Sequence, residues 1–281
     1  MIVFPTCKIN LGLRVPSKRQ DGYHNIETIF YPIQLTDALE VIRQTDPIQQ
    51  TITFSFSGLP INGKEDDNLC IKAYYLLKEN FPELPPIQAH LHKIIPMGAG
   101  LGGGSSDGAF MLRMLNDLFS LQLPDEKLCE YALKLGSDCP FFIYNSPCYA
   151  EGRGELLEPI SLSLKNYKIV LVYPALHVST AKAFSELNRN SAPIVYSDSL
   201  KDIIRLPVVE WKDKLVNEFE VPVINQFPEI AEIKSTLYDA GALFVSMTGS
   251  GSTVYALFEK TATPVLKFSE SYFFRIIEDL I

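Results

Sequence analysis

Apolar and polar positions along the chain form short runs of two kinds, one typical of strands and one of helices. Residues 51–57 alternate with a period of two, which predicts a half-buried strand. Residues 167–173 form a continuous apolar run, which is typical of a buried strand. Residues 1–60 are mostly strand-like. Further strands are expected at residues 87–95, 243–247 and 253–258.

Helical spacing predicts helices between these strands. Asn68 can cap a helix over residues 69–80, which ends near Pro82. Ser105 opens a second helix whose apolar side chains recur at helical spacing. Two more helices are expected over residues 124–135 and 179–188, whereas residues 268–281 fit a strand or a helix equally well. A polar, glycine-containing stretch at residues 151–155, followed by Pro159, suggests domains at 1–158 and 159–281.

Composition then narrows the class of protein. The 281 residues are 47% hydrophobic and 21% charged, as expected for a globular chain with a sizeable core. The net charge of −8 argues against a nucleic-acid partner or a basic membrane surface. It does not exclude a nucleotide ligand. No apolar run approaches the roughly 18 residues of a membrane helix, and the N-terminus has no apolar segment typical of a signal peptide.

The chain has five cysteines and no CxxC pair. An odd number without metal-site spacing predicts free thiols in a reducing cytoplasm.

Two glycine motifs match nucleotide-binding patterns only in part. Residues 58–64 fit the start of a P-loop, but Glu65 stands where Ser or Thr must hold the metal ion. Residues 98–103 fit a dinucleotide fingerprint, but the helix that follows leads to another helix instead of a strand. We therefore expect a turn at the first motif and no Rossmann unit at the second.

The strongest chemical signal is the stretch at residues 96–108. Glycine lets the backbone approach a ligand closely, and a helix N-terminus favours anions. Ser105 and Ser106 add hydroxyls that could reach a phosphate or Mg²⁺. The alternative is a flexible turn with Ser105 as a plain helix cap. The glycines of this stretch are Gly98, Gly100, Gly102, Gly103 and Gly104.

Other candidates allow two interpretations each. Residues 248–252 are either a simple hairpin turn or a second loop against phosphates. Asp138 is either a helix cap before Pro140 or a functional carboxylate. Lys8 in mid-strand is usually solvated. Tyr23 and His24 follow a turn and could simply pack or lie at the surface.

Together these motifs resemble a known superfamily. Residues 8–11, 96–106 and 247–251 resemble the three motifs of the GHMP kinases. Residues 21–24, 136–142 and 151–155 resemble one branch of it, which serves non-mevalonate isoprenoid synthesis. The resemblance runs from residue 3 to about residue 258.

The resemblance implies an α+β, two-domain fold, with a ribosomal-protein S5-like N-terminal domain and a ferredoxin-like C-terminal domain. It also implies transfer of the γ-phosphate of ATP, with Mg²⁺, to a hydroxyl of a small cytidyl substrate. Asp138 would be the base, and Lys8 would keep it ionised and orient the hydroxyl. Tyr23 and Phe184 would sandwich the cytosine, and His24 would bind its polar edge.

The other implied site residues fall into two sets. The nucleotide side would comprise Lys93, Pro96, Met97, Gly98, Gly100, Leu101, Gly102, Gly103, Gly104, Ser105 and Ser106, with Ser106 also near the metal. The substrate side would add Asn10, Phe30, Thr180 and Gly249 to the aromatic group.

Three alternatives stay open on the sequence. One is another GHMP kinase, acting on homoserine, mevalonate or a sugar, which would not need Tyr23, His24 and Phe184. The second is an inactive ligand sensor, which would not need Lys8 and Asp138. The third is a generic anion-binding module. We expect no nucleic-acid or membrane partner. We expect the chain to be a monomer or a weak homodimer.

Overall fold

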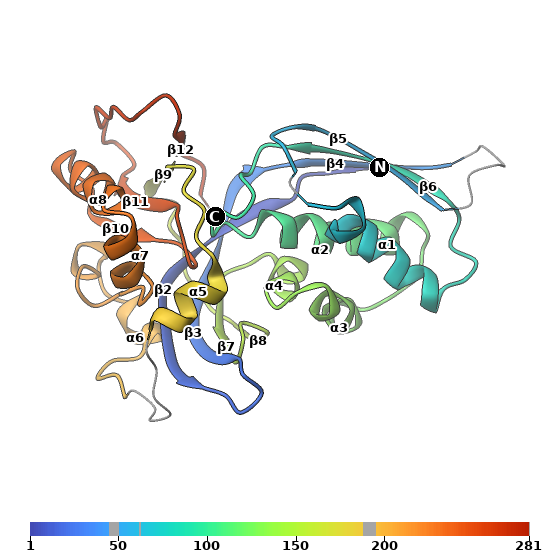
Figure 1. The fold of residues 1–281 in the computed structure, drawn as a ribbon, viewed down its shortest axis with the longest axis horizontal. Coiled ribbons are helices and arrows are strands. Elements are labelled where there is room, and N and C mark those ends of the chain that lie inside the picture. The colour runs from blue at the N-terminus through green and yellow to red at the C-terminus, as the bar shows by residue number, and fades with distance from the viewer. Residues whose placement is uncertain (45–50, 62, 188–194, 281) are drawn as a thin grey trace. The chain divides into compact units, whose positions relative to one another are not determined.

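The computed structural model describes residues 1–44, 51–61, 63–187 and 195–280. Its strands and helices are shown in Figure 1. The chain forms two compact units, each assembled from separated stretches. Unit 1 comprises residues 1–7, 35–97 and 102–146, and unit 2 comprises residues 8–34, 98–101 and 147–281.

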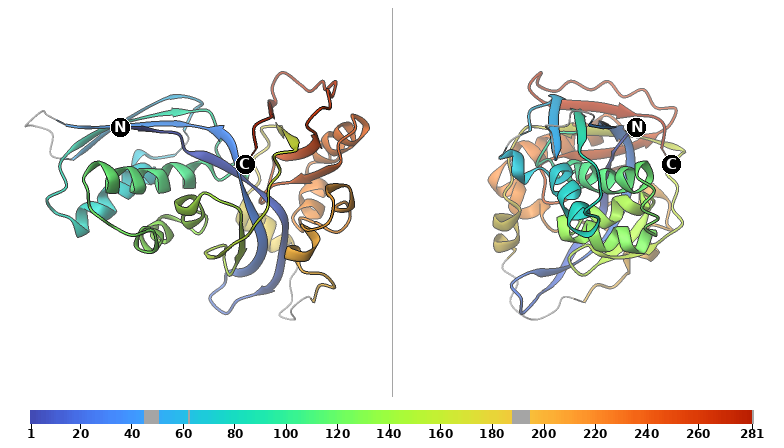
Figure 2. Two further views of the ribbon diagram at one scale, coloured as in Figure 1. Left: turned by 180° about the vertical axis from the view of Figure 1, so that it is seen from behind. Right: turned by 90° about the vertical axis from the view of Figure 1, so that its right-hand side faces the viewer.

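Unit 1 is a sheet covered by helices. Its strands lie in the order β1-β4-β6-β5, with only the β5–β6 pair parallel among the registers described. Helix α2 packs against α1, α3 and α4, and α1 and α2 run along one face of the sheet (Figures 1 and 2). The strands are β1 (Ile2–Val3), β4 (Ala38–Arg43), β5 (Ile52–Gly58) and β6 (Ile87–Lys93). The helices are the short η1 (Glu65–Asp67), α1 (Leu69–Asn80), α2 (Gly103–Leu118), α3 (Asp125–Leu135) and α4 (Cys139–Tyr144).

Unit 2 contains two sheets, in the orders β2-β3-β7-β8 and β10-β11-β9-β12. Helix α8 packs on β10 and β11 and against α7. Its strands are β2 (Thr6–Lys18), β3 (His24–Thr36), β7 (Cys148–Glu151), β8 (Leu156–Pro159), β9 (Tyr167–Tyr173), β10 (Phe244–Met247), β11 (Val254–Glu259) and β12 (Phe273–Ile277). Its helices are α5 (Thr180–Glu186), α6 (Leu200–Ile203), η2 (Val208–Glu210), α7 (Glu220–Gln226) and α8 (Glu229–Asp239). Residues 6–7 at the start of β2 and residues 35–36 at the end of β3 belong to unit 1.

The local sequence explains most element boundaries. Helix α1 has the predicted bounds, and the Asn68 side chain accepts a hydrogen bond from Cys70 N at 2.9 Å. Buried positions along α1 recur at helical spacing, from Cys70 to Leu77. Strand β9 also has its predicted bounds, and its five central residues are buried, as its continuous apolar run indicates.

Several boundaries differ by one or two residues from the sequence prediction, and two of these differences have a clear local cause. Strand β6 ends at Lys93 instead of residue 95, because Ile94 N and Ile95 N donate to Asp37 Oδ1 at 2.5 and 2.9 Å. Helix α2 begins at Gly103 instead of Ser105, because Gly102 caps it in the left-handed conformation. Ser105 therefore lies inside the first turn, and its interpretation as the helix cap is wrong.

The remaining expectations are largely confirmed. Residues 268–281, which the pattern left undecided, contain the strand β12. Helix α2 leads into α3, so no Rossmann unit forms. The predicted helix over residues 179–188 appears as α5, although residue 188 lies outside the described residues.

Candidate active site

The first glycine loop leads from β6 into the N-terminus of α2. The first-turn N–H groups of this 16-residue helix have no helical acceptors, and its dipole places positive potential there. Gly102 has φ +72°, which favours glycine. A Cβ at Gly103 would lie 2.8 Å from Ile95 Cγ2 and 3.0 Å from Lys93 Nζ. The glycines thus let the helix start close to its neighbours, with free amides available for an anion.

Two polar atoms in the first turns of α2 fit a nucleotide and its metal ion. Ser106 and Asp107 are buried. Within the part of the chain that the structure describes, Ser106 Oγ and Asp107 Oδ1 have no hydrogen-bond partner. Buried polar atoms are nearly always satisfied in native proteins, so such a pair calls for an explanation such as a ligand or ion. A hydroxyl and a carboxylate oxygen are also the ligand types that Mg²⁺ prefers.

Lys93 lies in a buried cluster of charges beneath this helix. Its ammonium donates to Asp37 Oδ2 and, at 2.8 Å, to Asp107 Oδ2. The side chain has no exposed surface. Burial alone would lower the pKa of Lys93, but the two carboxylates raise it above its ordinary value. Lys93 is predicted to line the nucleotide, and in the structure its ammonium pairs with two carboxylates inside the protein.

The same cluster changes the acidity of Asp107. One ammonium cannot neutralise two carboxylates, and burial disfavours the uncompensated charge. Burial accordingly raises the pKa of Asp107 to about 7, against the opposing effect of Lys93. Within the cluster, Asp107 is therefore the carboxyl whose pKa lies near neutral pH.

Lys8 is buried in β2 and forms part of a polar network in unit 2. Its Nζ donates to Asn10 Oδ1 at 2.6 Å and lies 4.8 Å from the centre of the Phe30 ring. Asn10 Nδ2 donates to Thr28 Oγ1 at 2.9 Å. The usual interpretation of a mid-strand lysine as solvated is wrong here, because β2 is buried from Thr6 to Val15.

The second glycine loop, between β10 and β11, packs against the start of the first. A Cβ on Gly100 would lie 2.2 Å from Thr248 O, so only glycine fits at this approach. Thr253 N donates to Ala99 O at 3.2 Å. Thr248 Oγ1 accepts from Asn10 N at 3.0 Å and lies 3.2 Å from both Asn10 Oδ1 and Gly100 O. The loop is thus more than a hairpin turn, since it joins the Lys8–Asn10 network to the first glycine loop.

Aromatic side chains gather around Phe184 in α5. The rings of His24 and Phe184 stack with centroids 4.8 Å apart and an interplanar angle of 16°. The rings of Phe184 and Phe219 pack edge to face, with centroids 4.8 Å apart. Tyr23 is 56% exposed, and the Arg153 guanidinium lies 4.9 Å from the centre of its ring. The structure therefore brings two of the three predicted cytosine-binding side chains into contact.

Thr180 begins α5, and its hydroxyl lies 2.9 Å from the hydroxyl of Ser250 in the second glycine loop. Gly249 in that loop has φ +58°. A Cβ at this position would lie 3.2 Å from Gly100 Cα. These two predicted substrate residues therefore belong to one loop system.

Asp138 immediately precedes α4 in unit 1, as the capping interpretation requires. Its side chain makes no capping hydrogen bond to that helix. Asp138 therefore does not act as a hydrogen-bonding cap of α4.

The cysteines are free, as the sequence indicates. Burial raises the pKa of the Cys7 and Cys139 thiols to about 12 in each case. Cys7 therefore has almost no thiolate at neutral pH, although it precedes Lys8 in the sequence.

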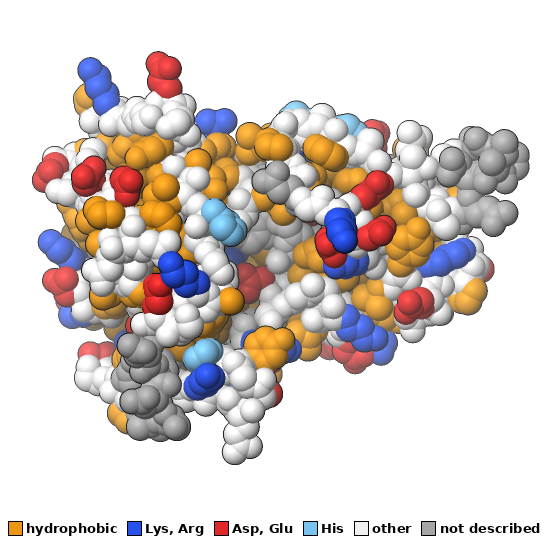
Figure 3. Space-filling view, viewed as in Figure 1, with side chains coloured by type: hydrophobic (Ala, Val, Ile, Leu, Met, Phe, Trp, Pro, Cys, Tyr) orange, Lys and Arg blue, Asp and Glu red, His pale blue; other side chains and the backbone are white. Residues whose placement is uncertain are grey.

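The surface carries charges of both signs. On the face drawn in Figure 3, Lys and Arg side chains are interspersed with Asp and Glu and form no single basic patch. Among the described residues, no group of three or more His, Cys, Asp or Glu side chains could hold a metal ion. The described helices are also too short or too polar to cross a membrane.

Comparison with known proteins identifies the family. Residues 68–146 match the GHMP kinases N terminal domain, and residues 177–268 match the GHMP kinases C terminal domain. The chain belongs to the GHMP kinase family. The predicted α+β fold, with its S5-like and ferredoxin-like domains, is thereby confirmed for this GHMP kinase.

Individual relatives agree with this assignment. A 4-diphosphocytidyl-2-C-methyl-D-erythritol kinase from Bacteroides fragilis is 54% identical over 258 residues, 92% of each chain. The crystal structure of a 4-(cytidine 5'-diphospho)-2C-methyl-D-erythritol kinase is 30% identical with a TM-score of 0.75, covering 92% of this chain and 90% of that one. A homoserine kinase from Cytophaga hutchinsonii has a TM-score of 0.68 at 14% identity, covering 96% of this chain and 95% of that one, and shares the fold alone.

In this GHMP kinase the predicted site residues belong to both compact units. Unit 1 carries Lys93, Pro96, Met97, Gly102, Gly103, Gly104, Ser105, Ser106 and Asp138. Unit 2 carries Lys8, Asn10, Tyr23, His24, Phe30, Gly98, Gly100, Leu101, Thr180, Phe184 and Gly249. Asp37 and Asn217 were not predicted from the sequence, although both form hydrogen bonds to segments that carry predicted site residues. A buried lysine at the inward-facing end of β6 was the available signal that a carboxylate such as Asp37 must lie nearby.

Proposed function

We propose that the chain transfers the γ-phosphoryl group of ATP to a hydroxyl of 4-diphosphocytidyl-2-C-methyl-D-erythritol, in non-mevalonate isoprenoid precursor biosynthesis. The observation that carries this choice among GHMP kinases is the 54% identity to a relative of that name over 92% of both chains. The grouping of the predicted cytosine-binding side chains His24 and Phe184 supports it, because flat aromatic rings suit a cytosine.

Asp138 is the base in this proposal. It accepts the proton of the substrate hydroxyl as the hydroxyl oxygen bonds to the γ-phosphorus and the bond to the leaving diphosphate oxygen breaks. A positioned base contributes about 10²–10⁴-fold in rate. The Asp138 side chain makes no capping hydrogen bond to α4.

Lys8 supplies positive charge to the same hydroxyl. Its ammonium is held by Asn10 Oδ1 at 2.6 Å, so its position is fixed before the substrate arrives. A preorganised cation stabilises developing negative charge without reorganisation during the reaction. It also favours the ionised form of a nearby carboxylate.

The phosphates bind along the stretch from Pro96 to Ser106, at the N-terminus of α2. ATP supplies the transferable phosphoryl group, and Mg²⁺ neutralises its charge when bound. Ser106 is the residue that we assign to the metal side, because its buried hydroxyl has no partner in the described residues. Lys93 supports this region through Asp107.

The cytidyl end binds at the aromatic group. Tyr23 and Phe184 hold the two faces of the cytosine, and His24 recognises its polar edge. Asn10, Phe30, Thr180 and Gly249 line the path of the methylerythritol and diphosphate, and Thr180 is already tied to the second glycine loop through Ser250.

The proposal also covers the domain bounds, the partners and the cellular compartment. The N-terminal kinase domain spans residues 1–158 and the C-terminal domain residues 159–281. The chain acts as a monomer or weak homodimer on a small molecule, without a nucleic-acid or membrane partner. Its free thiols fit the reducing cytoplasm.

The decisive experiment is a phosphoryl-transfer assay with purified protein, ATP and Mg²⁺. It compares the cytidyl substrate with homoserine and mevalonate as acceptors. We expect turnover with the cytidyl substrate and at least about 10²-fold lower kcat/KM for the others, since they leave the aromatic group unused. Faster turnover of homoserine or mevalonate would overturn the proposed substrate. ATP binding without transfer to any acceptor would favour a sensor.

A further inference from the structure

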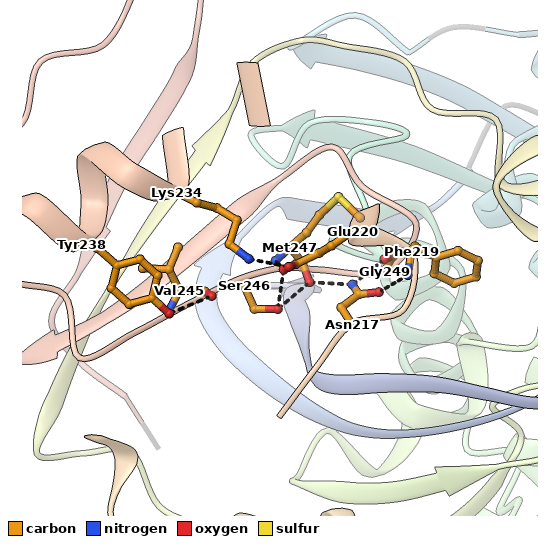
Figure 4. Close-up of polar contacts among 9 residues, drawn as sticks. All are labelled: Asn217, Phe219, Glu220, Lys234, Tyr238, Val245, Ser246, Met247 and Gly249. Atoms are coloured by element: carbon orange, nitrogen blue, oxygen red, sulfur yellow. Dashed lines mark hydrogen bonds and ion pairs between the residues drawn. The ribbon is translucent and has the colours of Figure 1, made fainter. Parts of the chain in front are cut away.

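Asn217 holds the second glycine loop at two points. Its side chain is fully buried. Nδ2 donates to Met247 O at 2.7 Å and to Gly249 O at 2.9 Å, on either side of Thr248. Oδ1 accepts from Phe219 N at 3.0 Å. Figure 4 shows this amide between the loop and the start of α7.

The segment that carries Asn217 is itself fixed to β2. Leu13 N donates to Val216 O, and Glu218 N donates to Leu13 O, both at 2.9 Å. The anchor of the loop is therefore attached to the strand that also bears Lys8 and Asn10.

A second anchor acts on the same loop from α7. Glu220 Oε1 accepts from Ser246 Oγ at 2.9 Å and from Met247 N at 2.7 Å (Figure 4). Its other oxygen pairs with Lys234. Glu220 thus holds the loop where it leaves β10, whereas Asn217 holds the peptides around Thr248.

Thr248 links this anchored loop to Lys8. The Thr248 hydroxyl accepts from Asn10 N and contacts Asn10 Oδ1. Asn10 Oδ1 is also the oxygen that holds Lys8 Nζ. A shift of the loop would therefore displace the acceptor that orients the ammonium.

We propose that Asn217 is a positioning residue for phosphoryl transfer, which fixes Thr248 and, through Asn10, the Lys8 ammonium. This inference rests on the proposed function of Lys8. Asparagine suits the role because one planar group supplies two donors to two carbonyls and one acceptor. Aspartate has almost the same shape but would place an oxygen against both carbonyl oxygens.

The test compares Asn217→Asp with the wild-type protein. We expect kcat to fall about 10- to 100-fold, because small misplacement of a catalytic group costs this much. KM for ATP should change less than about 3-fold, because the Lys8 contribution belongs to the transition state. A role in folding alone would lower the melting temperature and leave kcat of the folded protein unchanged, which would overturn the proposal.

Glu218→Gln is the matched control. Glu218 lies next to Asn217, but its carboxylate accepts from Val15 N at 2.8 Å and from the Tyr196 hydroxyl. This variant should lose stability and keep kcat. A loss of kcat as large as that of Asn217→Asp would mean that the whole segment matters and would overturn a specific role for Asn217.

A double-mutant cycle tests the route through Thr248. Thr248→Val removes the hydroxyl, and in that background Asn217→Asp should lower kcat by less than about 3-fold. If the fold-losses in kcat of the two single variants multiply in the double variant, Asn217 does not act through Thr248.

If Asn217→Asp does not fold, variants of Thr248 alone test the proposal. Thr248→Val should then lower kcat and Thr248→Ser should restore it, and normal kcat in Thr248→Val would overturn the proposal. An inactive wild-type protein would instead count against the proposed function itself.

Discussion

At the scale of single residues, the candidate site depends on polar side chains held away from water. Lys8, Asn10 and Lys93 are all buried, and each forms a hydrogen bond with another side chain. Burial makes these contacts strong and fixes their geometry, but it also makes the loss of one partner costly. Substitutions at this scale should therefore separate catalytic roles from structural ones.

Asp138→Asn should abolish most turnover while ATP still binds. The amide keeps the size of the side chain but cannot accept the hydroxyl proton, so kcat should fall at least about 10²-fold. Steady-state kinetics and a nucleotide titration measure the two effects. Asp125→Asn is the control, because Asp125 also stands at the start of a helix and is exposed. Near-normal turnover of Asp138→Asn would reduce this residue to a structural position.

Phe184→Ala should weaken binding of the cytidyl substrate with much less effect on ATP. Phe184 stacks on His24, and an aromatic pair contributes about 0.5–1.5 kcal/mol beyond area burial. Loss of that surface should weaken binding roughly 10-fold. Calorimetric titration of each substrate measures this split.

Phe184 also packs partly on the core of unit 2, so the variant should lose stability as well. Phe227→Ala serves as the control, because Phe227 packs on the same core and is not among the predicted site residues. It should lower the melting temperature without changing cytidyl affinity. Unaltered cytidyl affinity in Phe184→Ala would reject the stacking role.

At the scale of elements, the N-terminus of α2 joins two functions. Its first turn offers amides and a hydroxyl to phosphates, and Asp107 in the same helix anchors it to Lys93 and Asp37. The sequence predicted the helix and its glycine loop from local pattern. It did not predict the anchor, because Asp37 is 56 positions from Lys93 and only folding brings them together. Strand parity does place Lys93 on the buried face, with Ile87, Ala89 and Leu91.

Ser106→Ala should weaken Mg²⁺–ATP binding without reducing stability. Because Ser106 Oγ has no partner in the described residues, removing it sacrifices no internal hydrogen bond. The Kd of ATP with and without Mg²⁺, and the melting temperature, test both halves. Ser235→Ala on the exposed face of α8 should change neither. Unchanged metal dependence in Ser106→Ala would leave the serine only a packing role.

Asp107→Asn should make stability less dependent on pH. The pKa of Asp107 rises from 3.8 in its ordinary environment to about 7 in the fold. The folded state therefore holds this proton more tightly, and the associated stabilisation is lost as pH rises from about 4 to about 7. The neutral amide leaves Lys93 paired with Asp37 alone and removes that loss.

Urea unfolding at pH 5 and pH 8 measures the effect. Relative to wild type, Asp107→Asn should be more stable at pH 8 than at pH 5, by on the order of 1 kcal/mol or more. Asp117→Asn, on the exposed end of α2, should show the same difference at both pH values. An equal difference for Asp107→Asn would contradict a titration near neutrality.

At the scale of the whole molecule, neither compact unit is a continuous stretch of the chain. The sequence suggested one boundary near residues 151–159, where polarity and glycine content change. In the structure the chain passes between units at residues 7–8, 34–35, 97–98, 101–102 and 146–147. Most of these passages lie inside strands or the first glycine loop, where no change of composition marks them. Local pattern therefore predicts elements well, whereas the division into units follows from long-range contacts.

This interleaving predicts that the two units unfold in one transition. Cys70 lies in unit 1 and Cys148 in unit 2, and both thiols are buried. Strands β2 and β3 each contribute residues to both units, so unfolding one unit disrupts strands of the other. Pulsed alkylation along a urea series, with each cysteine quantified by mass spectrometry, should give coincident curves for Cys70 and Cys148. Cys129 is only partly buried and should react at lower urea, which controls for reagent access. Reaction of Cys148 at urea concentrations that still protect Cys70 would show that the units unfold separately despite their shared strands.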